Sequence, residues 1–231
     1  MKRFIVTGCP RSGTRFAATL FSALGIRCGH EDVFGPDQGL GDLPVEWNGY
    51  DADSSWHAVP FLPLDDVVVL HQVRHPLEVI RSIAGIRFLA RADLPNKATR
   101  AVRRNAPEIF EPESEAERAA TMWRIWNEKA EEHATFTYRL EDIDAVLVSH
   151  LCGLVGLDVS NDQVERALRD TPKNVNARDR DETVSWEQVA ALLPELPSHY
   201  GYDTPTTSMK ATGQGGLEPP TSGFGDQRST N

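Results

Sequence analysis

The sequence has few cysteines and no long apolar run. Its three cysteines, Cys9, Cys28 and Cys152, are widely separated in a chain of 231 residues, which fits neither a disulfide framework nor a cysteine metal site. No stretch of 18 apolar residues occurs, so a membrane-spanning helix is not expected. The apolar run near the N-terminus is too short for a signal peptide. These features predict a cytoplasmic protein without a bound metal or a membrane partner.

Positive charge is also scarce. The chain has 24 Lys and Arg against 34 Asp and Glu, a formal net charge of −10, and no nucleic-acid partner is expected of so acidic a protein. One segment departs from this balance, because seven basic residues and a single acidic one, Asp93, lie in the stretch that runs from Arg81 to Arg104. This segment is either a patch that steers an anionic substrate or a solvated basic helix face.

Apolar residues become rare near the C-terminus. Of the last 28 residues, 17 are Gly, Pro, Ser or Thr, and such a segment buries too little apolar surface to offset the entropy of ordering it. We therefore predict one domain over residues 1–203 and a disordered tail over 204–231. Residues 216–220 and 227–231 can be back-translated as the antisense of transfer-RNA arms. Two interpretations are open. The reading frame enters a transfer-RNA gene, as at the insertion site of a phage or other mobile element, or the segment is an ordinary flexible tail.

Short apolar runs alternate with amphipathic ones over the rest of the chain. Strands are predicted at 3–8, 26–29, 67–70 and 135–139. Helices are predicted at 16–24, from 76, at 114–133, and near 142–155, 160–170 and 185–193, several of them opened by a capping box. Residues 32–55 are rich in Gly, Asp and Pro and are predicted as a long functional loop. Strands that alternate with helices favour an α/β fold, a single domain with a P-loop-type parallel sheet and helices on both faces.

The first predicted strand runs into Gly8-Cys9-Pro10-Arg11-Ser12-Gly13-Thr14-Arg15. Glycines five apart between a strand and a helix let backbone N–H groups surround an anion, and the helix N-terminus adds the positive end of its dipole. The nucleotide triphosphatase pattern G-x-x-x-x-G-K-[ST] is broken here, because Thr14 stands in the Lys place and Arg15 in the place of the Mg²⁺-binding hydroxyl. Arg11 instead brings positive charge inside the loop. The loop is either a site for a phosphate-like group bound without a metal or a tight turn with incidental arginines.

A second candidate binding segment follows the apolar strand at 67–70. Ligands of parallel sheets lie at the carboxyl ends of the strands, and Arg74 is placed there. Ser82 lies in the second turn of the next predicted helix, where its side chain can point back to the same edge. An arginine fork and a hydroxyl at this spacing can grip one phosphate together.

Together these motifs resemble those of the P-loop sulfotransferases that use 3′-phosphoadenosine-5′-phosphosulfate. Pro10-Arg11-Ser12-Gly13-Thr14 looks like the family's 5′-phosphosulfate-binding loop. Arg74 and Ser82, eight residues apart, resemble its 3′-phosphate motif. Trp123 and the segment 138–142 resemble a long helix and a strand end further along the family's chain. The resemblance extends over about residues 3–200 in order and spacing.

The resemblance implies transfer of a sulfuryl group from this donor co-substrate to a hydroxyl or amine of a small-molecule or glycan acceptor, without a metal. The loop amides of Ser12, Gly13 and Thr14 are then expected to hold the 5′-phosphate, and Arg11 to stabilise the leaving oxygen. Arg15 replaces a threonine that the family usually has, and it supplies charge in place of that hydroxyl.

Three side chains are candidates for the general base that such a transfer needs. In several branches of the family a glutamate just after the second strand has this role, and Glu31 is in that place. His30 is second, because an ordinary histidine titrates nearer neutrality, and His57 is third. Each of the three is otherwise an exposed or capping side chain.

The late segment 173–180 lies where the family often has a basic flap over the donor. Arg178 or Arg180 is expected to reach the 3′-phosphate, unless the segment is a plain charged loop. Two alternatives to a sulfotransferase remain: a metal-dependent P-loop kinase or nucleotide hydrolase, and a non-catalytic nucleotide-binding module.

Overall fold

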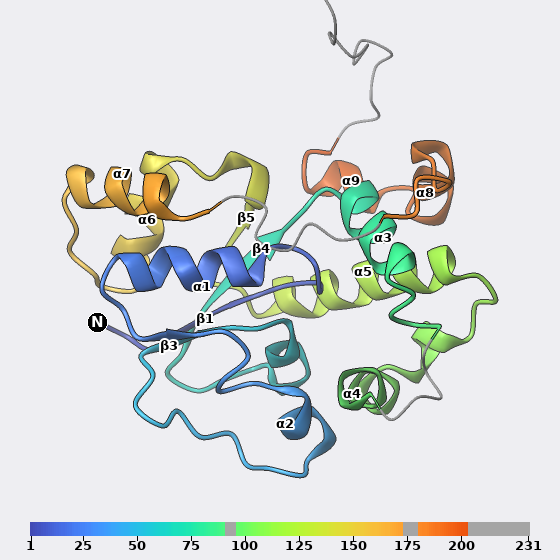
Figure 1. Cartoon of the computed structure of the whole chain (residues 1–231), viewed down its shortest axis with the longest axis horizontal. Coiled ribbons are helices and arrows are strands. Elements are labelled where there is room, and N and C mark those ends of the chain that lie inside the picture. Colours follow the sequence, from blue (N-terminus) through green and yellow to red (C-terminus); the bar gives the residue numbers. More distant parts are fainter. Residues whose placement is uncertain (91–95, 173–179, 203–231) are drawn as a thin grey trace, which may run out of the picture.

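The computed structural model describes residues 1–90, 96–172 and 180–202. In this part of the chain five strands form one sheet in the order β2-β3-β1-β4-β5, and each neighbouring pair is parallel. The strands are β1 (Phe4–Thr7), β2 (Cys28–Gly29), β3 (Ala52–Ser54), β4 (Val68–Val73) and β5 (Phe136–Arg139). The predicted α/β fold with a parallel sheet and flanking helices is confirmed (Figure 1).

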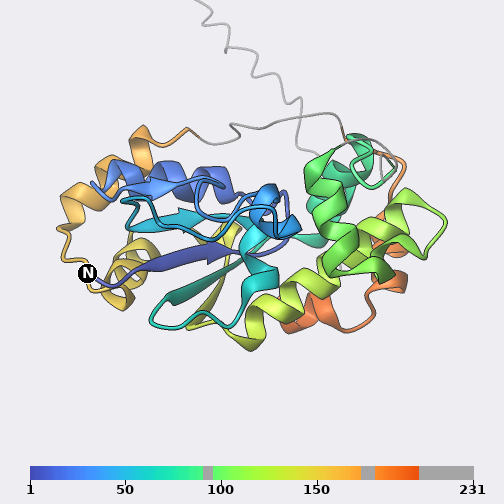
Figure 2. The ribbon, with the colours of Figure 1, turned by 90° about the horizontal axis from the view of Figure 1, so that it is seen from below.

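Helices pack around the sheet and extend beyond one of its ends. They are α1 (Thr14–Ala23), α2 (Pro36–Leu40), α3 (Pro76–Gly85), α4 (Lys97–Asn105), α5 (Glu115–Glu132), α6 (Ala145–Leu154), α7 (Asn161–Asp170), α8 (Trp186–Leu192) and α9 (Leu196–His199), with 3₁₀ turns at Trp56–Phe61, Pro107–Phe110 and Leu140–Asp142. The helices α3, α4 and α8 gather beyond the end where β1 finishes, away from α6 and α7 (Figure 1 and Figure 2). No helix in the described ranges is both long enough and apolar enough to cross a membrane.

Alternate residues of β1 face opposite sides of the sheet, as the pleat of a strand requires. Phe4 and Val6 pack with α1, α6 and α7, whereas Ile5 packs with Phe34 and Val69 on the other side. A separate apolar cluster joins α3, α5 and α8. Because β1 and β4 are neighbours, α1 and α3 both begin at the same edge of the sheet.

The prediction of one long loop over residues 32–55 is wrong, because α2 and β3 lie within it. The strand β3 is only three residues long and carries no apolar run that would mark it in the sequence. It nevertheless pairs with β1 on one side and β2 on the other. At its centre, the buried Asp53 accepts hydrogen bonds from the backbone N–H groups of Asp32 and Phe34. Tertiary pairing, and not local propensity, makes this segment a strand.

The predicted capping boxes are confirmed. The side chains of Ser114, Ser160 and Ser185 each accept a hydrogen bond from the backbone three residues on, at the starts of α5, α7 and α8. In the basic stretch, for which a helix face was one of the two alternatives, α4 forms between Lys97 and Asn105. The predicted tail 204–231 lies outside the described residues.

Candidate active site

The loop between β1 and α1 lies directly against β4. A Cβ atom at Gly8 would overlap the carbonyl oxygen of Gln72, and a Cβ atom at Gly13 would lie 2.8 Å from a methyl group of Leu140. Gly13 also has a φ of 95°, and Arg11 has a φ of 71°, which is in the left-handed region that a side chain disfavours. The glycines therefore serve close packing, and the loop holds Arg11 in a strained conformation.

Buried side chains of β4 and β5 fix the backbone of this loop. Gln72 donates a 2.6 Å hydrogen bond from Nε2 to the Ser12 carbonyl and accepts a 2.9 Å bond from the Tyr138 hydroxyl. The Ser12 amide donates to the Cys9 carbonyl at 3.2 Å. Ser12 therefore differs from the prediction, since its amide closes the loop on itself instead of facing an anion. The first turn of α1, which begins at Thr14, still presents backbone N–H groups that the helix itself does not use.

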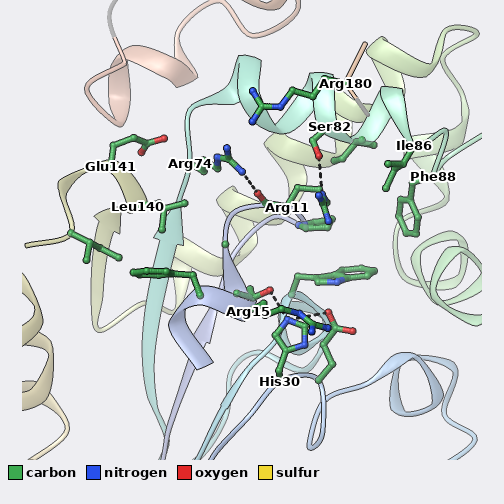
Figure 3. Close-up of a pocket in the computed structure, with 18 of the residues that line it drawn as sticks. Arg11, Arg15, His30, Arg74, Ser82, Ile86, Phe88, Leu140, Glu141 and Arg180 are labelled. Carbon is green, nitrogen blue, oxygen red and sulfur yellow. Dashed lines mark hydrogen bonds and ion pairs between the residues drawn. The ribbon is translucent and has the colours of Figure 1, made fainter. Parts of the chain in front are cut away.

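Two arginines and a serine join the loop to α3. The Nε of Arg11 donates a 2.8 Å hydrogen bond to the Oγ of Ser82, which is 71 positions later in the chain. The Nη1 of Arg74 donates to the Arg11 carbonyl at 3.1 Å. Figure 3 shows the Arg11 side chain below Ser82 and beside Arg74. The structure thus brings together the two segments that the sequence proposes as phosphate sites.

A carboxylate on α3, that of Glu78, holds Arg74 and Arg180. Arg74 Nη2 lies 3.3 Å from Glu78 Oε2, and Arg180 Nη1 lies 2.6 Å from the same oxygen. Arg81 fixes the chain near Arg180, because its Nε donates to the Val184 carbonyl at 2.8 Å. Arg180, one of the two arginines expected to reach the 3′-phosphate, thus shares a carboxylate oxygen with Arg74. Arg178, the other candidate, lies outside the described residues.

Arg11, Arg74, Ser82 and Arg180 line one pocket of about 530 Å³. Its lining also includes Arg15. Its apolar lining belongs to two core clusters, the one on α1 and α7 with Phe16, Ile143 and Leu168, and the one of α3 and α5 with Trp56, Ile83 and Phe88. Leu140 and Ile86 also line the pocket. Leu140 lies on one side of Arg11 and Phe88 on the opposite side (Figure 3). A molecule with a charged centre and two apolar ends matches this order.

Glu31 and His30, two of the candidate bases, also line the pocket. Glu31 has a φ of 66°, and the turn that contains it is held by Asp53 and Asp32, which accept backbone hydrogen bonds. Burial raises the pKa of Glu31, while a hydrogen bond from the Trp56 side chain and the charge of Arg15 oppose that rise. Burial, followed by the charge of Arg15, lowers the pKa of His30. The rise brings the pKa of Glu31 closer to neutral pH, where a general base works best. The fall in the pKa of His30 keeps its ring neutral but makes it a weaker base.

His57 does not reach the pocket. It is 3% exposed, its ring lies 3.6 Å from that of Trp56 between centroids, and the pocket wall does not include it. Burial lowers its pKa to about 3, so the ring stays neutral over the physiological range. His57 packs on Trp56, so of the three candidate bases only Glu31 and His30 line the pocket.

The basic side chains that the structure describes in the stretch from Arg81 to Arg104 do not line the pocket either. Lys97 pairs with Asp37 at 2.6 Å, Arg104 donates to the Leu40 carbonyl, and Arg103 lies over the ring of Phe110. In the described part of this segment, the pocket takes only Ser82, Ile83, Ile86 and Phe88. Its described arginines and lysine therefore lie outside the pocket, where they contribute to helix packing or to the electrostatic field around the pocket.

Several residues of the site carry no motif and were not predicted from the sequence. Gln72 offers one signal, a polar residue within an apolar strand. Asp53 offers none, because its strand was not recognised. Glu78 and Trp56 acquire their roles from partners that are distant along the chain, Arg180 for the first and Glu31 for the second.

A scan against models of known protein families finds no match to this chain, and a search of curated proteins finds none. The pocket itself is what bears on function. It combines a helix N-terminus, three arginines with described hydrogen-bond partners and a serine hydroxyl, all of which bind anions. A carboxylate and an imidazole stand at one side of it. The arrangement suits transfer of an anionic group to an acceptor that must lose a proton.

Proposed function

We propose that this protein is a sulfotransferase that moves a sulfuryl group from 3′-phosphoadenosine-5′-phosphosulfate to an acceptor hydroxyl or amine. The observation that carries the proposal is the 2.8 Å hydrogen bond from Arg11 to Ser82, because it unites the candidate 5′-phosphate loop with the candidate 3′-phosphate motif in one pocket. Thr14 and Arg15 weigh against a metal-dependent kinase, since they replace the Lys and the Mg²⁺-binding hydroxyl of that motif.

The two apolar sets on opposite sides of Arg11 suggest the orientation in which the donor binds. The end with Leu140 and Ile143 would receive the flat nucleobase, and the first turn of α1 would hold the 5′-phosphate. Arg74 and Arg180 would bind the 3′-phosphate, aided by the hydroxyl of Ser82, which accepts from Arg11 and still has its own hydrogen to donate. The sulfuryl group then lies towards Glu31.

The reaction exchanges the sulfur–oxygen bond of the donor for a new bond from sulfur to the acceptor. The acceptor oxygen or nitrogen forms a bond to sulfur as the bond from sulfur to the 5′-phosphate oxygen breaks, and its electron pair leaves with adenosine 3′,5′-bisphosphate. Glu31 takes the acceptor proton, or His30 does so in its place. Arg11 stabilises the charge that grows on the leaving oxygen, where a fixed donor is most effective.

Binding of adenosine 3′,5′-bisphosphate tests this proposal. A ligand at about 100 times its Kd stabilises the folded state by about 2.7 kcal/mol, so Tm should rise by roughly 5–10 °C with EDTA present. ATP with Mg²⁺ should raise it much less. A larger shift with ATP and Mg²⁺ would favour the kinase. Binding of the bisphosphate without turnover of the full donor on any acceptor would favour a non-catalytic nucleotide-binding module.

A further inference from the structure

The end of the pocket opposite Leu140 has an aromatic and aliphatic wall. The rings of Trp56 and Phe88 meet edge to face, with centroids 5.9 Å apart and planes at 88°. Ile83 is fully buried beside them, and Ile86 is half-buried. Figure 3 shows Ile86 and Phe88 together on the side of Arg11 away from Leu140. This wall offers a flat apolar ring a surface on two sides.

One acidic group borders the wall. The Trp56 side chain lies close enough to the Glu31 carboxylate to lower its pKa, and the His30 ring nitrogen lies 4.0 Å from that carboxylate. Trp56 therefore contributes the apolar face and a polar N–H beside the carboxylate. Ile83 and Ile86, which also line this wall, have no polar side-chain atoms with which to bind a ligand.

We propose that the acceptor is a small, uncharged aromatic hydroxyl compound of the phenol type, which rests its ring on Trp56 and Phe88 and directs its hydroxyl to Glu31. The inference rests on the proposed function and names its substrate class. A saccharide is a poor fit, because its several hydroxyl groups would lose water against isoleucine side chains without gaining partners. An acceptor carboxylate near the ring would be repelled by Glu31.

The acceptor end can be tested separately from the donor end. Protein saturated with adenosine 3′,5′-bisphosphate is titrated by calorimetry with 2-naphthol and, in parallel, with cellobiose. Turnover of each compound is then measured with the full donor. We expect 2-naphthol to bind and to be sulfated, and cellobiose to bind at least 100-fold more weakly.

Two variants test whether 2-naphthol binds at this wall. Phe88→Ser and Ile86→Ser should each raise the Kd for 2-naphthol about tenfold or more, since each removes apolar surface from the wall, with the bisphosphate Kd unchanged. Val146→Ser, at a side chain that is 79% exposed on α6, is the matched control and should change neither Kd. The half-buried Ile86 gives a second variant if Phe88→Ser fails to fold.

The outcomes separate the two proposals. Failure of the bisphosphate to bind overturns the proposed function. Bisphosphate binding with preferred turnover of cellobiose overturns only the acceptor class. Equal binding of 2-naphthol to wild type, Phe88→Ser and Ile86→Ser places the ring elsewhere and also overturns it.

Discussion

Arg180 donates a 2.6 Å hydrogen bond to Glu78, a side chain 102 positions earlier in the chain. The same carboxylate oxygen lies 3.3 Å from Arg74. Glu78, on α3, therefore holds both arginines in place. It also competes with any anion that approaches them, because a carboxylate and a phosphate use the same guanidinium donors.

Arg180→Ala should weaken the binding of adenosine 3′,5′-bisphosphate by about tenfold, because a charge-assisted hydrogen bond is lost and the site is partly exposed. Adenosine 5′-monophosphate, which lacks the 3′-phosphate, should bind as before. Arg180 is a cleaner choice than Arg74, whose Nη1 also supports the Arg11 carbonyl. Equal losses for the two nucleotides, measured by calorimetry, would show that Arg180 does not contact the 3′ end.

Glu78→Gln should have the opposite effect. Removal of the competing charge should tighten bisphosphate binding a few-fold at low salt, and the gain should shrink at high salt as charges are screened. Glu128→Gln is the matched control, since Glu128 also forms an i,i+4 pair with an arginine, Arg124, but on the exposed side of α5. Weaker binding by Glu78→Gln would mean that orienting the arginines outweighs the competition.

Arg11→Ala and Arg11→Gly should both lower the transfer rate by about 10²–10³, because each removes a donor aimed at the leaving oxygen. Their stabilities should differ. Arg11 has a φ of 71°, a conformation that glycine adopts without strain, so the alanine variant should unfold more readily by up to about 1 kcal/mol. Chemical denaturation measures this difference. Full activity of either variant in the transfer assay would exclude the leaving-group role of Arg11.

Buried histidines should make the fold less stable in acid. Burial lowers the pKa of His71 to about 4 and that of His57 to about 3. The unfolded chain protonates both near pH 6.5, so below that pH it binds more protons than the folded state, and stability falls as pH falls. Burial raises the pKa of Asp53 to about 6, which opposes part of this loss below pH 6. The expected net loss is about 1–2 kcal/mol per pH unit between pH 6 and 5.

Denaturant unfolding at several pH values measures that slope. His71→Gln should reduce it, because the substitution removes one of the two buried histidines that the unfolded chain protonates. His150→Gln, at an exposed position of α6, should leave it unchanged. An unchanged slope in His71→Gln would show that His71 is protonated alike in the folded and unfolded states.

The parts of the fold that have local signals could be predicted from the sequence. Ser114 predicts the start of α5 because a capping box acts within one turn, and the buried strand β4 is marked by its apolar run. The strand β3 could not be predicted, because what makes it a strand is pairing on both sides and the hydrogen bonds that Asp53 accepts. Its neighbours lie far away in sequence.

The candidate site likewise has residues that the sequence predicts and residues that it does not. Arg11 and Arg74 belong to short patterns next to predicted strand ends, so their convergence followed from the topology of a parallel sheet. The Glu78 contact to Arg180 spans 102 residues and has no local pattern. His57 was a candidate by residue type alone, and its burial beside Trp56 became visible only in the packed structure.

The pH dependence of the transfer rate should identify the base. Glu31 must be ionised to take a proton, so the rate should rise with pH through its pKa, which burial raises above the ordinary value for glutamate. Glu31→Gln should lower the rate on 2-naphthol by about 10²–10⁴ and leave bisphosphate affinity unchanged. It should affect 4-nitrophenol less, because this more acidic acceptor needs less help to lose its proton.

Trp56→Phe gives the finest test of this assignment. The Trp56 side chain donates a hydrogen bond that stabilises the ionised form of Glu31 and thus lowers its pKa. Phenylalanine keeps an aromatic face but has no donor, so the pKa of Glu31 should rise and the acid limb of the pH–rate profile should move to higher pH. Trp47→Phe, outside the pocket, is the control and should leave the limb in place. If Trp56→Phe leaves the limb unmoved and His30→Ala abolishes it, the proton goes to His30, and Glu31 instead orients the acceptor.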